Sequence, residues 1–397
     1  MKRIAYISCL GIIGILTAEF GVIGILPQIA AYYHIPIEKA GLLLSLFSLA
    51  VGVLGPFTSL VAARYNRKAV MAASLTIYLI TSIISACSPP FWLLLTVRLL
   101  PTLLHSAYYA AALSAVISTT APDKQHKLMA IALSGVSVAT VTRVPLSTWL
   151  ASVSSWHYSF GLQAAVSALA LLAILLLLPS LPVVGRPTYG SQLQILKKPA
   201  VWLSLAMCVL LFAAEFSLYS YSAAYLMRVK SATPREVSYY MFLFGLTGLF
   251  GTWLAGRALS KSIARTNVAF LFGCTVLVPL GLFYAGNSPL ATAMLVAGWG
   301  ILYAPGFLIA TSSISSAAPE ALEFANGLTT SFANFGITLG TVAGGWVISH
   351  ASIAQNPWLS LGLGVAAIGL VGARSLWDAR TSYPPAAPVL SPGLLSK

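Results

Sequence analysis

The stretch CLGIIGILTAEFGVIGILP, residues 9–27, places a single carboxylate, Glu19, inside an otherwise apolar run. The run extends from about residue 4 to residue 31, and a membrane-crossing helix needs about 20 mostly apolar residues. Glu19 lies roughly 22 Å along such a helix, because each residue adds about 1.5 Å. The stretch therefore predicts a transmembrane helix with a charge deep in the bilayer, where a charged side chain is costly and indicates function.

The same pattern recurs 196 residues further along the chain. That offset aligns Ala-Glu-Phe at 18–20 with Ala-Glu-Phe at 214–216, and it aligns the glycine pair at 52 and 55 with the pair at 248 and 251. One shared offset of about half the chain predicts an internal duplication. Two parallel six-helix halves then enclose a substrate site near the bilayer midplane.

The composition extends this prediction to the whole chain. Of 397 residues, 58% are hydrophobic and 8% are charged, whereas about a quarter of a soluble protein is charged. A water-soluble enzyme is excluded, and we predict an all-α integral membrane protein with twelve transmembrane helices in two pseudo-symmetric six-helix bundles. The predicted spans are approximately 4–31, 40–62, 69–87, 91–119, 127–152, 157–179, 199–226, 234–259, 266–285, 288–316, 323–350 and 357–377.

The spans and the connectors between them predict four segments of the chain. Short connectors join most of them, and one longer connector contains Pro182 and Pro187 and ends in two lysines. The end of the chain is rich in proline, which favours disorder. The predicted segments are an N-terminal six-helix bundle at 1–179, a cytoplasmic linker at 180–198, a C-terminal six-helix bundle at 199–378 and a disordered cytoplasmic tail at 379–397.

The basic residues predict the orientation. The formal net charge is +14, which in a soluble protein raises nucleic acid as a partner. With the N-terminus inside, however, sixteen of the 22 Lys and Arg fall in cytoplasmic segments, four fall in outer loops, and Arg98 and Arg143 lie within the membrane. Cytoplasmic loops of membrane proteins carry this excess. We therefore predict cytoplasmic termini in a multi-pass protein, and no nucleic-acid partner.

The cysteines do not indicate a metal or a disulfide. Cys9, Cys87, Cys208 and Cys274 lie far apart, in or at the ends of apolar runs, without the spacing of metal ligands. We interpret them as small packing residues. No metal and no cofactor are expected.

Two membrane carboxylates are the candidates for proton coupling. Burial favours the protonated form of a carboxylate, so Glu19 and Glu215 are suited to carry a proton while a substrate moves the other way. A structural ion pair or a neutral, hydrogen-bonded acid remains the alternative. Tyr219 and Tyr221 near Glu215 also suit plain substrate recognition.

Arg98 and His105 are seven residues apart and so share one helix face. An arginine does not shed its charge, so Arg98 needs a carboxylate, carbonyl groups or water. It is either the partner of a membrane acid such as Glu19 or a fixed strut between two spans. His105 is either a proton relay or a hydrogen-bonded packing residue.

Arg143, sixteen residues past Lys127, also lies deep in a predicted span. A buried cation there invites a carboxylate of the protein or of the substrate, and the alternative is a side chain that extends towards the interface. Tyr108, Tyr109 and Tyr219 are further candidates to line a substrate cavity.

Several motifs resemble those of the major facilitator superfamily, within it the twelve-span drug:proton antiporters, and most of all the arabinose, sugar and purine-nucleoside efflux permeases. The matching segments are TAEFG at 17–21, LPQIA at 26–30, Arg98 followed by HSAYY at 105–109, VPL at 144–146 and Trp156. The resemblance implies proton-driven export through a rocker-switch cycle, with Glu19 as the proton-carrying acid and Arg98 as its electrostatic partner. It also implies a monomer in the bacterial inner membrane.

The sequence departs from the family pattern at two places. In the loop between the second and third spans, Arg64, Arg67 and Lys68 match the conserved conformational loop, but Ala63 stands at its acidic position. In span five, Arg143 and Ser147 stand where the family has glycines beside a proline. Substrate or coupling is therefore expected to differ from those of a typical drug pump.

A proton-coupled exporter of small amphipathic or polar molecules, such as drugs, sugars or nucleosides, is the leading interpretation. Uptake of a small, possibly anionic, solute by symport or uniport uses the same acids and stays open. A non-transport membrane sensor is the third alternative. An enzyme is not expected, because the spans lack a nucleophile–base pair and a metal cluster.

Overall fold

The computed structural model describes residues 2–182, 192–318 and 322–381, and every regular element in these ranges is a helix. Twelve helical segments within them are long and apolar enough to cross a membrane, which confirms the all-α, twelve-span prediction. Residues 183–191 of the predicted linker and 382–397 of the predicted tail lie outside the described residues.

The N-terminal half contains the first six spans. One of its helices starts with a side-chain cap, in which Asn66 accepts a hydrogen bond from the Lys68 amide at 3.0 Å. Its elements are α1 (Lys2–Phe20), η1 (Gly21–Ile25), α2 (Leu26–Tyr32), α3 (Ile37–Ala40), α4 (Leu42–Ala62), α5 (Arg67–Ala86), α6 (Phe91–Leu99), α7 (Thr102–Ser118), α8 (Pro122–Val153) and α9 (His157–Leu177).

The C-terminal half contains the other six spans. Thr233 and Glu236 form a reciprocal capping box at the start of α12, in which the Glu236 carboxylate accepts from the Thr233 amide at 2.7 Å. After η2 (Gln192–Lys197), its elements are α10 (Pro199–Tyr219), α11 (Ser222–Arg228), α12 (Pro234–Leu259), α13 (Ile263–Phe272), η3 (Gly273–Leu277), α14 (Val278–Tyr284), α15 (Pro289–Tyr303), α16 (Gly306–Ala317), α17 (Leu322–His350), η5 (Ile353–Gln355) and α18 (Asn356–Thr381).

Equivalent spans of the two halves are interrupted at similar positions. Span one changes from α-helix to the 3₁₀ turn η1 after Phe20, and span seven breaks after Tyr219. Spans four and ten each break at a proline, Pro101 and Pro305. A proline lacks the amide hydrogen that continues a helix, and broken helices near the midplane leave carbonyl groups for side chains to bind.

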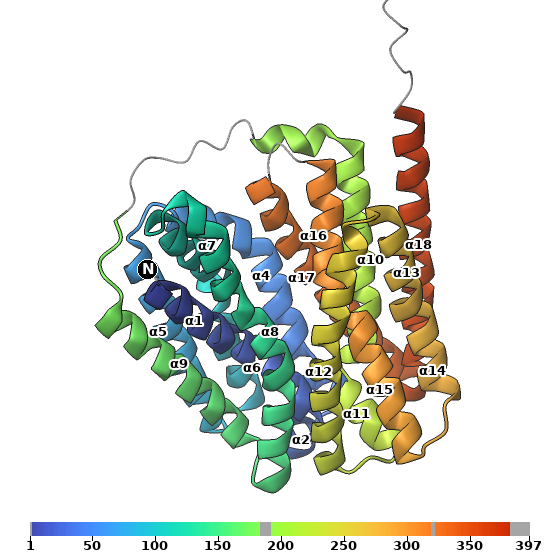
Figure 1. Cartoon of the computed structure of the whole chain (residues 1–397). Helices are drawn as coiled ribbons and strands as arrows, with labels where there is room; N and C mark the ends of the chain where they lie inside the picture. Colours follow the sequence, from blue (N-terminus) through green and yellow to red (C-terminus); the bar gives the residue numbers. More distant parts are fainter. Residues whose placement is uncertain (1, 183–191, 319–321, 382–397) are drawn as a thin grey trace, which may run out of the picture.

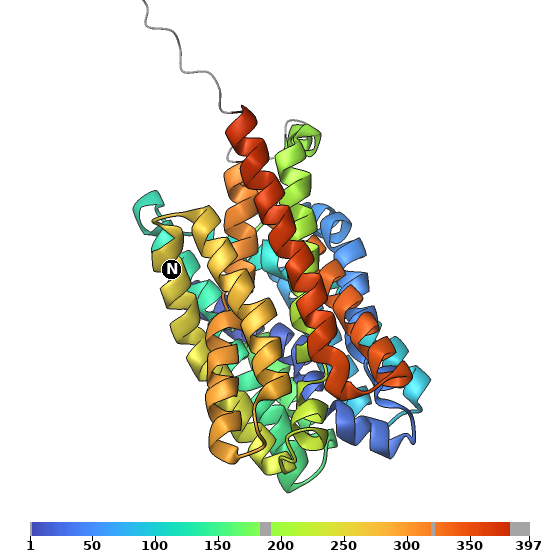
Figure 2. The same ribbon diagram turned by 90° about the vertical axis from the view of Figure 1, so that its right-hand side faces the viewer.

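The two halves stand side by side, as the blue-to-green and yellow-to-red bundles of Figure 1 show. They meet where α4 packs on α17 and where α8 packs on α12. A Cβ added at Gly245 of α12 would lie 2.6 Å from Val141 Cα of α8, so the two backbones nearly touch. In Figure 2, α18 runs along the outer face of the C-terminal half, against α10 and α13.

The halves meet mainly towards the end that is distant from the termini. There Tyr221 of the C-terminal half lies against Gly41 of the N-terminal half, and α3 packs on α17. Along α8, residues 143–145 are buried, whereas five of the six side chains from Leu133 to Val138 are exposed. The protein is therefore closed at the distal end and more open at the end that carries the termini.

Candidate functional site

Glu19 is 2% exposed and lies in the last turn of α1, just before the helix changes to η1. Its Oε2 atom lies 3.7 Å from Nε2 of His105 on α7. The other ring nitrogen of His105, Nδ1, lies 2.7 Å from the hydroxyl of Tyr78 on α5. Three spans thus bring a carboxylate, an imidazole and a phenol into one array. If Tyr78 donates to Nδ1, then Nε2 carries the hydrogen that faces Glu19.

Arg98 binds the backbone at the end of α1. Its Nη2 donates to the carbonyl oxygens of Ala18 at 3.0 Å and Glu19 at 3.5 Å. Its guanidinium carbon also lies 5.5 Å from the ring centre of Phe160. Arg98 acts electrostatically on the Glu19 carboxylate but forms no ion pair with it among the described residues. It therefore fixes the helix end on which Glu19 sits.

Arg143 lies between the two halves. It is 7% exposed, so its side chain is buried between helices rather than extended to a membrane surface. Its guanidinium carbon lies 4.1 Å from the ring centre of Phe20, which is a cation–π distance. Its charge acts on Glu19 of the N-terminal half and on Tyr219 and Tyr303 of the C-terminal half.

The corresponding acid of the second half has different neighbours. Glu215 is 3% exposed, and its Oε1 accepts a hydrogen bond from Cys274 Sγ at 3.5 Å. Cys274 lies in the π-helical turn η3, a kind of irregularity that is frequent at functional sites. A Cβ at Gly306 would lie 2.6 Å from the same oxygen, so the carboxylate packs on the first turn of α16.

Phe20 and Phe216, which the 196-residue offset relates, touch each other. Their ring centres are 5.8 Å apart across the boundary between the halves. Beside Phe216, Tyr219 and Tyr303 have ring centres 4.7 Å apart and belong to an aromatic cluster with Phe244. The duplicated motif thus places equivalent residues on the line where the two bundles meet.

The chain matches the model of the Major Facilitator Superfamily over residues 8–340. It is a member of that superfamily. It is 28% identical over 343 residues to the inner membrane transport protein YdhP of Escherichia coli (strain K12), covering 86% of this chain and 87% of the relative. It is 25% identical over 338 residues to a probable sugar efflux transporter of Pasteurella multocida (strain Pm70), covering 85% and 83%.

Solved structures agree with this assignment at the level of the fold. A bacterial homolog of the human lysosomal transporter Spinster, in an inward-facing and occupied conformation, has a TM-score of 0.76 at 16% identity and covers 96% of this chain and 98% of its own. The nucleoside transporter NupG has a TM-score of 0.72 at 16% identity, covering 97% and 100%. This superfamily member is therefore a multi-pass membrane transporter and not an enzyme.

The two neighbouring tyrosines of span four in this Major Facilitator chain point in different directions. The Tyr109 ring lies 5.6 Å from the His105 ring and so joins the site. Tyr108 is fully buried against Gly11 of α1, and its hydroxyl has no hydrogen-bond partner. The sequence did not single out Tyr78 or Tyr303, since aromatic residues are common in membrane helices and only tertiary contacts distinguish these two; Phe20 was noted only as part of the repeated Ala-Glu-Phe motif.

The basic loop of this superfamily member connects parts of the N-terminal half. Arg67 Nε donates to Ser114 Oγ at 2.7 Å, and Lys68 Nζ donates to the Leu175 carbonyl at 3.0 Å. Arg64 is exposed. Arg67 and Lys68, the first two residues of α5, thus attach the start of this helix to α7 and α9.

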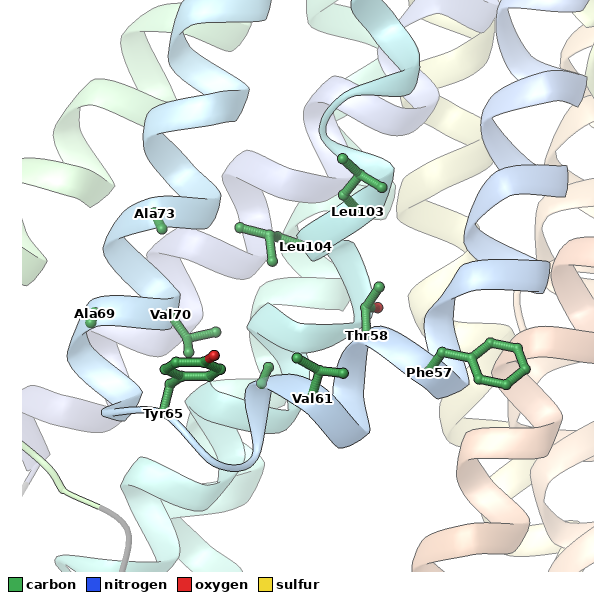
Figure 3. Close-up of a pocket in the computed structure, with 10 residues that line it drawn as sticks. Phe57, Thr58, Val61, Tyr65, Ala69, Val70, Ala73, Leu103 and Leu104 are labelled. Atoms are coloured by element: carbon green, nitrogen blue, oxygen red, sulfur yellow. The ribbon is translucent and has the colours of Figure 1, made fainter.

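A cavity of about 400 Å³ lies on the side of the N-terminal half, between α4, α5 and α7 (Figure 3). Its lining is apolar and includes Phe57, Val61 and Leu103, with Tyr65 and Ala73 beside them. None of the buried charged residues lines it. This cavity is therefore separate from the site at the boundary between the halves.

Proposed function

We propose that this transporter is a proton-coupled antiporter that exports a small amphipathic or polar solute by alternating access. The array of Glu19, His105 and Tyr78 supports the proposal most directly, because it sets a buried carboxyl group beside an imidazole and a phenol, one residue before Phe20 at the boundary of the halves. Protons enter down their gradient as the solute leaves. The site is in the bacterial inner membrane, with both termini cytoplasmic and the monomer as the working unit.

Glu19 takes up the proton in this mechanism. In its neutral form it is compatible with burial, and in its charged form it is balanced by Arg143 and Arg98, which both act on it. A solute that binds the charged carboxylate competes with the proton, and this competition couples the two movements. His105 presents its Nε2 hydrogen to the charged Glu19 carboxylate, and Tyr78 holds the imidazole in that orientation. Glu215 is the second proton-coupling acid, held in the other half.

The boundary of the halves supplies the substrate-binding residues. Arg143 and Tyr109 extend from the N-terminal half, while Glu215 and Tyr219 extend from the C-terminal half. Relatives named as probable sugar efflux transporters favour a small polar solute as substrate. Tyr108 has a supporting part through its packing on α1.

The experiment is proton flux in liposomes that contain the purified protein and an imposed pH gradient. Lipophilic cations, pentoses, nucleosides and amino-acid-like compounds are added one at a time. We expect one class to collapse the gradient, and Glu19→Gln to abolish this effect while the protein still folds.

Glu236→Gln is the matched control. Glu236 is not buried, and glutamine also completes a capping box, so this variant loses a carboxylate without losing the helix cap. It should transport normally. Normal proton coupling in Glu19→Gln would refute the carrier role, and exchange of labelled solute without proton movement would make the protein a facilitator.

A further inference from the structure

The centre of the site holds a buried arginine and a buried carboxyl group that do not form an ion pair with each other. The charge of Arg143 acts on Glu19, yet the described residues contain no ion pair between them. Arg143 interacts with the Tyr219 side chain, but its Nε atom is buried without a hydrogen-bond partner. Glu19 contacts His105 through Oε2, and its Oε1 accepts no hydrogen bond from the described residues. Arg143 Nε and Glu19 Oε1 therefore remain available to a ligand.

The other buried charges of the site have hydrogen bonds within their own half, although Arg98 Nε, like Arg143 Nε, has no partner. Arg98 binds the carbonyl oxygens of Ala18 and Glu19, and Glu215 accepts from Cys274. A buried charge without a complementary group is strongly unfavourable, so a ligand that supplies the complement binds with a large gain. Arg143 and Glu19 differ from these groups in their position, because Arg143 lies over Phe20, the residue after Glu19, and Phe20 contacts Phe216 of the other half.

The signs of the two charges determine the chemistry of that ligand. A ligand with only a negative charge binds Arg143 but places that charge near the Glu19 carboxylate. A ligand with only a positive charge binds Glu19 but is repelled by Arg143. A ligand with both groups satisfies both residues: its carboxylate matches the planar donors of Arg143, and its ammonium matches the Glu19 carboxylate. The ammonium and the proton then compete for Glu19, which is the competition that antiport requires.

The surroundings of the charges are aromatic. Phe20 lies under the Arg143 guanidinium, Phe216 lies against Phe20, and Tyr219 and Tyr303 follow on the C-terminal side. Rings at these distances bind flat apolar groups through stacked or edge-to-face contacts.

We propose that the exported solute is a small zwitterion with a carboxylate, an ammonium group and an aromatic or apolar side group. The carboxylate binds Arg143, the ammonium binds Glu19, and the side group lies among Phe20, Phe216 and Tyr219. This inference rests on the proposed antiport function and specifies its substrate class.

The test uses four related probes in the liposome assay. L-phenylalanine has both charged groups, its amide lacks the carboxylate, N-acetyl-L-phenylalanine lacks the ammonium, and arabinose has neither. We expect L-phenylalanine to give a saturable proton flux and each singly charged analogue to give about a tenfold smaller one, because a charge-assisted hydrogen bond is lost. Equal flux with either analogue overturns the proposal.

Two variants locate the recognition. In Arg143→Gln, we expect L-phenylalanine to lose its advantage over the amide, and in Arg143→Lys, which keeps the charge but not the planar donors, part of it should remain. Arg257→Gln is the matched control, since Arg257 also lies over a ring, Trp253, at 3.9 Å, but is exposed. Unchanged discrimination in both Arg143 variants, with normal folding, overturns the assignment.

The outcomes also separate this inference from the proposed function. Proton flux with arabinose but not with L-phenylalanine refutes the proposed zwitterionic substrate and still supports the proposed antiport function. Absence of proton flux with every probe and with the wider panel of solutes refutes both.

Discussion

Tyr78 is the residue that links the imidazole of His105 to a third span. It is fully buried, and its hydroxyl is the partner of His105 Nδ1. With that contact, the ring keeps one orientation and presents Nε2 to Glu19. A buried nitrogen that loses its partner retains the full desolvation cost, so the contact matters for both stability and proton movement.

Tyr78→Phe should lower the stability of the protein by about 1–3 kcal/mol and slow proton flux. Tyr225→Phe is the control, because its hydroxyl also donates to a buried partner, the Leu282 carbonyl at 2.8 Å, but away from Glu19. It should lower stability without slowing transport. Thermal unfolding measures the loss of stability, and proton flux measures the loss of transport. If the losses of flux for Tyr78→Phe and His105→Ala add up in the double variant, the two residues do not act in a shared array.

The tyrosine pair of span four shows why sequence determined only part of the site. Tyr108 and Tyr109 look alike in sequence, and the helix turns by about 100° between them. Tyr109 therefore lies beside His105, while Tyr108 packs on Gly11. Glu19, Arg98 and His105 were identifiable because charged groups are rare in membrane spans. Tyr78 and Cys274 were not, since only tertiary contacts give them a role.

At the scale of elements, the spans follow from hydrophobic run length, but their interruptions do not. Apolar runs predicted spans at 4–31 and 199–226, and the helices lie at Lys2–Tyr32 and Pro199–Arg228. The 3₁₀ turn after Phe20 and the π-helical turn at Cys274 leave hydropathy unchanged, so a pattern of apolar residues does not reveal them.

Helix α12 has one glycine that packs within its own half and another that packs against the other half. A Cβ at Gly251 would lie 2.0 Å from the Ile301 carbonyl oxygen of α15, in the same bundle. A Cβ at Gly245 would lie 2.6 Å from Val141 of α8, in the other bundle. Gly256 has open space around its Cβ position. One helix thus offers three sites for the same substitution.

Gly251→Ala should destabilise the C-terminal half by about 1–3 kcal/mol through overpacking. Gly245→Ala should instead leave the stability of each half nearly unchanged and slow transport, because it prevents the close approach of α8 and α12. Gly256→Ala is the control and should be neutral or slightly stabilising. Thermal unfolding and proton flux are measured for the three variants. An equal loss of stability for Gly245→Ala and Gly251→Ala would contradict the prediction that only Gly251 packs within a half.

At the scale of the whole molecule, alternating access requires contacts that form and break. The described structure joins α4 to α17 near the distal end, where Thr338 Oγ1 donates to the Ser45 carbonyl at 3.2 Å. Within the C-terminal half, Ser220 and Thr341 have their hydroxyl oxygens 2.7 Å apart. If the halves rock as rigid bodies, the first pair separates during transport and the second pair does not.

Cross-linking distinguishes these two pairs. Cysteines are placed at 45 and 338, or at 220 and 341, in an active background whose four native cysteines are alanine, and each pair is joined by a short reducible thiol reagent. The link between α4 and α17 should stop transport, because the distal ends of the two halves cannot separate while they are joined. A reductant should restore transport. The link within the C-terminal half should leave transport nearly unchanged, since both of its residues move together. Transport that continues with 45 joined to 338 would mean that the solute passes without separation of the halves at this end, and the rocking of two rigid bundles would have to be abandoned.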